Sequence, residues 1–502
     1  MQILEFLVNE ILSVPAFLIG IITAVGLFAL RRSVGDVIGA ALKAVLGFML
    51  IGAGAGVVSG ALEPLGAMIN AATGAQGVIP TNEAIAGIAQ AEYGSQVAWL
   101  LILGFGLSLV IARFTSLRYV FLTGHHALFM ATMLTIILAT AGYNSVTVIL
   151  VGAIVLAIMM VSLPALSQRW TRTITGDDSI AMGHFGTLGY VSSACVGSAL
   201  NKIARPSPST EDLQLPSGLK FLRDSMVTTA LSMALMYVII AAIALPRLGN
   251  TDAFAIFEQE ASSVGNYFMQ SVTQGLTFGV GVAIILFGVR TVLGELIPAF
   301  QGIADKVVPG AIPALDCPIV FPYAQNAVLI GFFASFLGGL LGLAVLSAWL
   351  SPAFGVALIL PGLVPHFFTG GAAGVYGNAT GGRRGAFFGA LTNGLIITFL
   401  PAFLMSVLGK FSSNTTTFGD ADFGWLGLLI GYSTHAGQAV GLILILLIGV
   451  GVLGLALLAQ KNLAPLAAQE TPKVSAARQQ HDYPKIPRPH GAPIPPAHID
   501  YE

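Results

Sequence analysis

Residues 77–83 read GVIPTNE, and residues 310–316 read GAIPALD. Each copy places an acidic residue, Glu83 or Asp316, after a Gly/Pro break in otherwise apolar sequence, and the copies lie 233 positions apart (316 − 83). Paired Gly/Pro interruptions in two halves of a hydrophobic chain are typical of a transporter's binding site. Further phrases recur in the same order at similar spacing: GALEP at 60–64 and GELIP at 294–298, FLTGH at 121–125 and FFTGG at 367–371, LPA at 163–165 and 400–402, and Gly-Asp at 176–177 and 419–420.

The composition predicts an all-α polytopic membrane protein. Hydrophobic residues make up 55% of the 502 residues and charged residues only 9%, whereas a soluble domain carries about a quarter charged residues. Apolar runs near the ~20 residues that a helix needs to cross a bilayer predict about eleven spans, at 11–30, 37–59, 96–112, 125–140, 143–162, 224–245, 264–287, 324–346, 353–373, 385–405 and 437–459. Four stretches broken by Gly, Pro and polar residues are predicted to form re-entrant hairpins, namely 60–92, 174–200, 294–320 and 415–434.

Basic residues predict the orientation of the chain. Most of them fall in alternate loops, which places the N-terminus outside and the C-terminus in the cytoplasm. Equivalent points of the two copies carry opposite charge bias, so we expect inverted repeats at roughly 37–200 and 264–434 within a membrane domain of residues 1–461. Residues 462–502 are polar and rich in Pro and His, which predicts a disordered cytoplasmic tail. Its histidines reflect this composition better than a metal site: His481, His490 and His498.

Ionisable side chains inside spans are the first candidates for function. Asp316 ranks highest, because a carboxylate at an unwound break can accept hydrogen bonds from ligand hydroxyls; the alternative is a structural cap of the next half-helix. Glu83 is its positional twin. His125 closes FLTGH where the second copy has Gly, and His184 lies in a glycine-rich hairpin. The remaining candidates are Glu295 and Asp305, with His126, His366 and His435 expected to pack rather than bind.

Several function classes lack their sequence signals. A Walker A motif is absent, so we expect no ATP hydrolysis by this chain. The two cysteines form no CxxC or Cys/His metal spacing, and no Ser/His/Asp arrangement is visible. We therefore predict no cofactor, no metal and no nucleic-acid partner.

Six phrases resemble the membrane permease (IIC) component of the L-ascorbate phosphotransferase system. They are LTGH at 122–125, STEDLQLP at 209–216, GELIPAFQGI at 294–303, PGAIPALDC at 309–317, YAQNAV at 323–328 and GGRRGA at 381–386. The resemblance covers roughly residues 10–460. It implies a homodimeric inner-membrane permease. Each protomer would have a sugar-binding core domain and a V-motif dimerisation domain, and the core would move relative to the V-motif domain in elevator fashion. A cytoplasmic IIB, phosphorylated by IIA, would then pass its phosphoryl group to the sugar.

The resemblance also implies a substrate site. Its LTGH histidine matches His125, its hairpin histidine matches His184 and its aspartate matches Asp316. The sequence departs from ascorbate permeases elsewhere, with phenylalanine in place of glutamine at two positions and Asn-Glu in place of Thr-Tyr, so the sugar stays open. The expected site therefore also includes these departures: Phe129, Phe185, Asn82 and Glu83.

Two alternatives to an ascorbate permease follow from the same residues. One is the same system with a pentitol or hexitol as substrate, because Glu83 would tend to repel an ascorbate anion. The other is a proton- or sodium-coupled secondary carrier that uses Glu83 or Asp316 as its coupling site.

Overall fold

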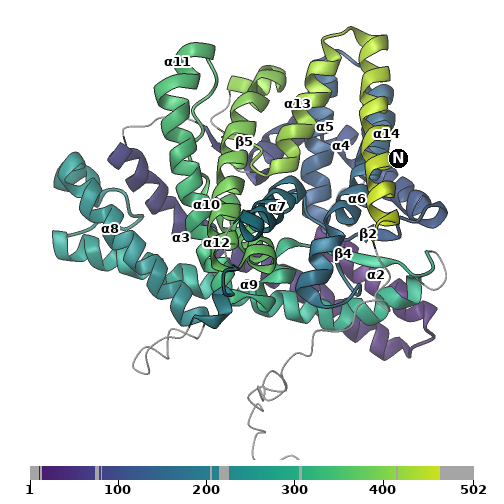
Figure 1. Cartoon of the computed structure of the whole chain (residues 1–502), viewed down its shortest axis with the longest axis horizontal. Coiled ribbons are helices and arrows are strands. Elements are labelled where there is room, and N and C mark those ends of the chain that lie inside the picture. The colour runs from purple at the N-terminus through teal and green to yellow at the C-terminus, as the bar shows by residue number, and fades with distance from the viewer. Residues whose placement is uncertain are drawn as a thin grey trace, which may run out of the picture. The chain divides into compact units, whose positions relative to one another are not determined.

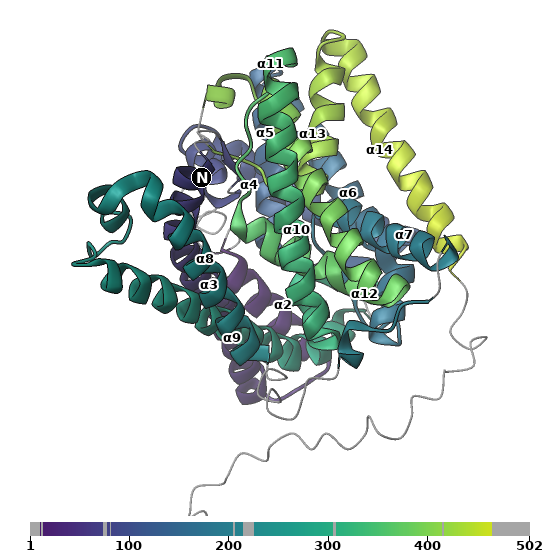
Figure 2. The same cartoon turned by 60° about the vertical axis from the view of Figure 1, so that its left-hand side comes forward.

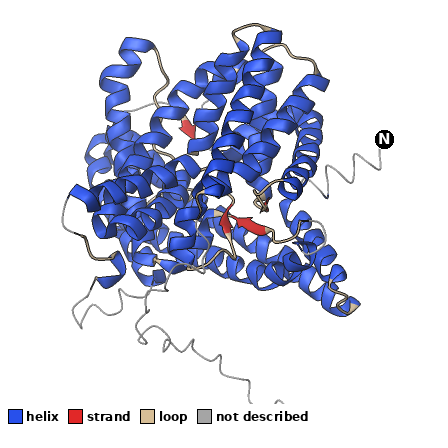
Figure 3. Cartoon of the chain, turned by 45° about the vertical axis from the view of Figure 1, so that its right-hand side comes forward, coloured by secondary structure: helices blue, strands red, loops and turns tan. Residues whose placement is uncertain are grey.

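The structure is a computed structural model that describes residues 11, 14–73, 78–80, 82–203, 206–213, 225–304, 308–413 and 416–463. Helices make up most of this part of the chain, and a few very short strands lie among them (Figure 3). The C-terminal tail lies outside the described residues, so its prediction stays untested.

Figures 1 and 2 show how the helices are arranged. Their bounds are α2 Pro15–Ala29, α3 Val34–Thr73, α4 Asn82–Phe114, α5 Gly124–Thr140, α6 Ser145–Thr175, α7 Thr187–Ile203, α8 Ser225–Phe254, α9 Val264–Ala304, α10 Gln325–Val345, α11 Ser351–Phe354, α12 Leu363–Leu404, α13 Ala421–Thr434 and α14 Gln438–Lys461. The strands are β1 Ile79–Pro80, β2 Tyr119–Phe121, β3 Ala181–Met182, β4 Ile312–Leu315 and β5 Thr416–Thr417.

Seven helices within the described residues are long and apolar enough to cross a membrane, and the shorter α5 is apolar along its length. This agrees with a polytopic membrane protein of the all-α class. The predicted spans 353–373 and 385–405 lie mostly within α12, an element made of two helical halves. Gly382 interrupts that element with φ 57° and ψ −148°, a conformation that favours glycine.

The two halves of α12 lie side by side on either side of Gly382. Asn393 in the second half donates a hydrogen bond to the Thr369 hydroxyl in the first half over 3.2 Å. Asn393 also donates to Ser335 of α10 over 3.3 Å. Polar side chains thus bind the helical hairpin to its neighbour, as happens between helices in membranes.

The predicted hairpins differ from the expectation in where they break. Residues 60–73 continue α3, and residues 294–304 continue α9, so neither helix breaks at its Gly/Pro phrase. The chain unwinds further on, into β1 and β4. The stretches 174–200 and 415–434 each contain a short strand followed by a helix.

The unwound segments satisfy one another's backbone groups in two small parallel sheets. β4 lies between β2 and β3, while β1 pairs with β5 and also forms a bridge from Val78 to Ile359. Backbone hydrogen bonds of 2.7–2.9 Å join these segments. Such pairing is what makes non-helical backbone tolerable inside a membrane protein, because no water is available there.

Two groups of helices emerge from the packing. Helices α2, α3, α8 and α9 pack mainly on one another. Helices α4 to α7 pack with α10 and with α12 to α14, and these carry the strands at their centre. Large apolar side chains are exposed on both groups, which suits contact with lipid: among them Leu42, Leu46, Leu235, Met269, Leu447 and Val450.

Candidate functional site

The site is built around Asp316, the residue that directly follows strand β4. The strand stops there because the chain turns into a 3-10 helix, Cys317–Tyr323, and Asp316 is the residue before its first turn. One carboxylate oxygen, Oδ1, accepts a hydrogen bond from the backbone N–H of Cys317 over 2.7 Å. The side chain keeps 23% of its surface exposed, so it can also contact a ligand.

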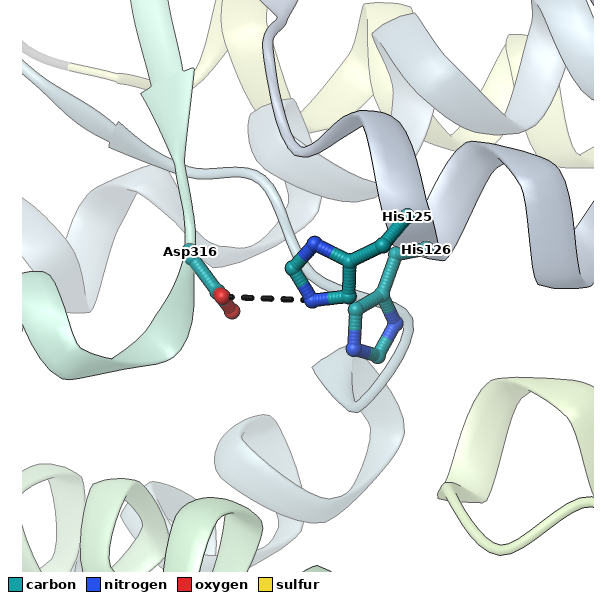
Figure 4. Close-up of side chains that lie close together, drawn as sticks. All are labelled: His125, His126 and Asp316. Atoms are coloured by element: carbon teal, nitrogen blue, oxygen red, sulfur yellow. Dashed lines mark ion pairs between the residues drawn. The ribbon is translucent and has the colours of Figure 1, made fainter. Parts of the chain in front are cut away.

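His125 lies in the first turn of α5, directly after β2. Because β2 and β4 are neighbours, the imidazole faces the carboxylate, with Nε2 3.4 Å from Asp316 Oδ2 (Figure 4). Its side chain is 27% exposed. The ring also lies 6.0 Å, centroid to centroid, from the ring of Phe48 in α3.

His184 reaches the same carboxylate from the loop between β3 and α7. Its Nε2 is 3.8 Å from Asp316 Oδ1, and the side chain is buried. Its other nitrogen, Nδ1, forms a 2.7 Å hydrogen bond with the Tyr190 hydroxyl. Gly183 permits this approach, because a Cβ there would collide with the backbone carbonyl of Ala314.

Aromatic rings surround the histidines on the buried side. His126 packs on His184, with ring centroids 3.7 Å apart, and stacks on Phe423 at 5.9 Å. Phe129 lies edge-on to His125, at 5.9 Å. Phe185 is fully buried and stacks on the Phe121 ring at 5.0 Å. The two phenylalanines predicted for the site therefore pack against histidine rings: Phe129 against His125, and Phe185 against His126.

Asn82 joins the site through a residue that the sequence did not single out. Asn82 donates from Nδ2 to Asp420 Oδ2 over 2.7 Å and accepts from the Gly419 N–H over 2.9 Å. Asp420 is buried, and a carboxylate oxygen of it lies within 4.8 Å of ring nitrogens of His126 and His184. A side chain from the first half of the chain thus fixes a carboxylate from the second half beside the histidines.

Asp422, two residues further on, holds the start of α7. Its two oxygens accept hydrogen bonds from the backbone N–H groups of Thr187 and Leu188 over 2.6 and 3.0 Å. Trp425 donates to the same carboxylate over 2.7 Å. Because α7 begins three residues after His184, Asp422 fixes the position of that histidine's loop.

The other candidates lie elsewhere or outside the described set. Glu83 belongs to the first turn of α4, but its side chain is not among those described, and Asp305 lies outside the described residues. Glu295 forms an ion pair with Lys43 over 2.9 Å. His366 is buried and bonded to Ser335 over 2.8 Å, as expected for a packing residue. His435 is exposed at the end of α13, with its ring against Tyr432.

Sequence reasoning missed Tyr190, Asp420 and Asp422. The signal for the aspartates was available, because both stand at the start of an apolar helix that follows a Gly and a break. Buried carboxylates at such a position are functional candidates. Tyr190 carried no local signal, because tyrosine is common in apolar helices and membrane interfaces.

The geometry suits a hydroxylated ligand. Asp316 offers acceptors, and each neutral imidazole offers one donor and one acceptor. The 3.4 and 3.8 Å separations between Asp316 and the two histidines are long for direct hydrogen bonds. A ligand with adjacent hydroxyl groups can offer each of these side chains a shorter hydrogen bond than the one between them.

Comparison with known proteins identifies the family of the chain. The chain is similar over 451 residues, at 26% identity, to the ascorbate-specific PTS system EIIC component of Mycoplasma pneumoniae. That similarity covers 82% of this chain and 66% of the relative, so the chain spans just under two thirds of the relative's length. Residues 10–422 match the family EIIC-GAT, described as the PTS system sugar-specific permease component. With a multi-pass helical fold and a polar site at its unwound centre, this chain belongs to the family of sugar-specific PTS permease components.

Proposed function

We propose that this permease carries L-ascorbate or a closely related sugar, bound between Asp316, His125 and His184. The observation that carries the proposal is the convergence of these three side chains, from separate segments, at the ends of neighbouring strands. The relative named for ascorbate supports the choice of sugar. Asn82 and Glu83 belong to the same proposed site, with Phe129 and Phe185 as its floor.

The sugar would cross the membrane by an elevator motion. The two groups of helices described above are the candidates for the moving core and the fixed V-motif dimerisation domain of a homodimer. Phe48 supports this assignment, because it extends from α3 of one group to His125 of the other. The site therefore faces the boundary along which the two groups would slide.

An internal inverted repeat underlies this mechanism. Strand β4 in the second half pairs with β2 and β3 of the first half, and β1 in the first half pairs with β5 and bridges to Ile359 in the second. The two arrangements correspond strand by strand, with β1 in the place of β4 and β5 in the place of β3. This exchange, together with the opposite charge bias of the loops, favours two copies related by inversion.

We place the N-terminus outside and the C-terminus in the cytoplasm. Separate IIB and IIA proteins would then meet the basic cytoplasmic edge, which includes Arg290, Arg383 and Arg384. Arg383 is partly fixed there, because its Nε donates to the Ser209 carbonyl over 3.1 Å. Arg290 is exposed and would face an acidic partner surface.

A neutral polyol is the second candidate substrate. Phe129 and Phe185 offer no hydrogen bonds where ascorbate permeases are expected to have amides, and Glu83 adds a negative charge. A pentitol or hexitol would leave fewer polar groups unpaired and would not be repelled. Each unpaired buried polar group costs about 1–3 kcal/mol, which is enough to reverse a preference.

Uptake into membrane vesicles tests the proposal. Vesicles that contain the permease receive labelled ascorbate, galactitol or a pentitol, with or without IIA, IIB and phosphoenolpyruvate. Formation of ascorbate phosphate, or of another sugar phosphate, only with the complete system supports the proposed function. Accumulation of unmodified sugar driven by a proton or sodium gradient would instead establish the secondary carrier.

A further inference from the structure

We propose that His126, His184 and Asp420 form a binding site for a divalent transition metal of the zinc class. The three side chains come from α5, from the loop before α7 and from the residue before α13. Each is buried, and one donor atom from each lies within 4.8 Å of the other two. The metal site shares His184 with the proposed sugar site, and Asn82, which belongs to that sugar site, contacts Asp420. The metal site stands whichever sugar is carried.

The donor set matches zinc chemistry. Two imidazoles and one carboxylate are a common set of zinc ligands, and they leave a fourth position open. Bond lengths of about 2.0–2.2 Å place tetrahedral ligand atoms about 3.3–3.6 Å apart. The ligand atoms here lie within 4.8 Å of one another, so they must approach by at most about 1.2–1.5 Å. Rotation of side chains on a strand–helix junction is sufficient for that movement.

Two of the proposed ligands, His184 and Asp420, have hydrogen-bond partners that would orient them toward a metal. The Tyr190 hydroxyl occupies His184 Nδ1 at 2.7 Å, which leaves Nε2 for the metal. Asn82 donates to Asp420 Oδ2 over 2.7 Å and orients that carboxylate. Hydrogen bonds of this kind fix the tautomer and direction of metal ligands.

His126 provides an independent observation. Its Nδ1 is buried and has no hydrogen-bond partner among the described residues. Buried polar atoms are nearly always partnered, so each exception needs an explanation such as an ion. Ligation of a metal through Nδ1 would give this nitrogen its partner.

The site escaped sequence analysis because its ligands are distant in the chain. His126 and His184 are 58 positions apart (184 − 126), and Asp420 follows after a further 236 (420 − 184). Zinc motifs are recognised by short fixed spacings. Here the parallel strands, rather than the spacing, bring the ligands together.

Metal binding is measured on the full-length chain in lipid nanodiscs, without sugar. The tail histidines are first replaced by glutamine at positions 481, 490 and 498, so that they do not bind metal. Calorimetry with Zn²⁺ should show one site per chain, and Zn²⁺ should raise the melting temperature by mass action. Absence of Zn²⁺ binding by this parent protein overturns the proposal, while its sugar binding remains separately measurable.

Variants assign the ligands. His126→Ala and Asp420→Asn should each lower Zn²⁺ affinity by more than about 100-fold, and Asn82→Ala by about 10–100-fold, the usual effect of removing a partner of a ligand. His435→Ala, at an exposed histidine, should leave the affinity unchanged. Full affinity in His126→Ala or in Asp420→Asn contradicts the site.

A spectroscopic measurement on the parent protein tests the site without relying on variants that fail to fold. Co²⁺ bound by the parent should give the intense visible absorption of a four-coordinate site, and Zn²⁺ should displace it. A weak six-coordinate spectrum overturns the proposal. Loss of the signal in Asp316→Asn but not in Asp420→Asn would move the metal to the neighbouring set of His125, His126 and Asp316, which also overturns the assignment.

Discussion

At the scale of single residues, Asp316 combines a structural cap with the proposed binding role, which sequence analysis treated as alternatives. One oxygen accepts the Cys317 N–H and so begins a 3-10 helix, while the other faces His125 at 3.4 Å. A carboxylate has enough acceptor positions for both. The structural role thus holds the charge in place for the proposed binding role.

Asp316→Asn separates these two roles. The amide oxygen can still accept from Cys317 N–H, but the charge is lost, so we expect sugar affinity to fall about tenfold or more, because a hydrogen bond to a charged group is worth about 1.5–3 kcal/mol. Calorimetry measures this fall. Asp36→Asn, at an exposed carboxylate, serves as the control, and unchanged affinity in Asp316→Asn would remove Asp316 from the site.

Phe185→Gln tests whether the ring supports the site or contacts the sugar. The ring is fully buried against Phe121 and Phe423, so the change should cost at least about 3 kcal/mol, the usual loss on removing a buried Phe ring. Thermal unfolding in detergent measures it. The exposed control Phe388→Gln should unfold like the parent. A stable Phe185→Gln variant that gains ascorbate affinity would show that the ring contacts the sugar.

At the scale of elements, short strands place the site residues. Each candidate lies within four residues after the end of a strand. The register of β2, β3 and β4 therefore brings His125, His184 and Asp316 together. Helix α7 is then held at its start by Asp422. Carboxylates are favourable at a helix N-terminus, where unpaired N–H groups point outward.

Asp422→Ala should affect both stability and binding. It removes the partners of two buried N–H groups and of Trp425, so we expect a loss of about 2 kcal/mol or more and weaker sugar binding through movement of His184. The control is Asn144→Ala, which removes the exposed cap of α6. That control should cost about 1 kcal/mol and leave affinity unchanged; equal binding losses in both variants would argue against a positioning role for Asp422.

The sequence predicted most of the helices, because apolar runs of bilayer length are a strong signal. It also identified His125, His184 and Asp316, which lie together although 191 positions separate the first from the last (316 − 125). The sequence was less informative about where the helices are interrupted. The FFTGG phrase lies inside α12 rather than at a strand–helix junction, and Gly371 packs on Val328. Pairing between distant strands leaves no local pattern, so the sequence did not predict that Asp420 lies beside His126 and His184.

At the scale of the whole molecule, the boundary between the two groups of helices is the feature that transport would use. Phe278 of α9 packs there on Phe332 of α10 and Phe367 of α12, with ring centroids 6.0 and 5.0 Å apart. These are packed apolar contacts without hydrogen bonds between the rings. Such a surface can slide at little cost, because few directional bonds must break.

Crosslinking across this boundary tests the elevator motion. In a protein whose native cysteines are replaced by serine, cysteines at Phe278 and Phe332 are joined with a short bismaleimide, and uptake should be lost. The matched control joins cysteines at Lys43 and Glu295, which pair within one group and should spare uptake. Both pairs must transport before linking. Transport that persists through the Phe278–Phe332 link would rule out relative motion of the groups.

The exchange of strands between the two halves also constrains how the chain is made. β2 emerges from the ribosome 191 residues before its partner β4 (312 − 121), and β1 emerges 336 residues before β5 (416 − 80). The first half must therefore enter the bilayer with unpaired strand backbone that only later synthesis can satisfy. Such groups are costly in lipid, so the nascent half depends on protection by the translocon or by water until its partner arrives.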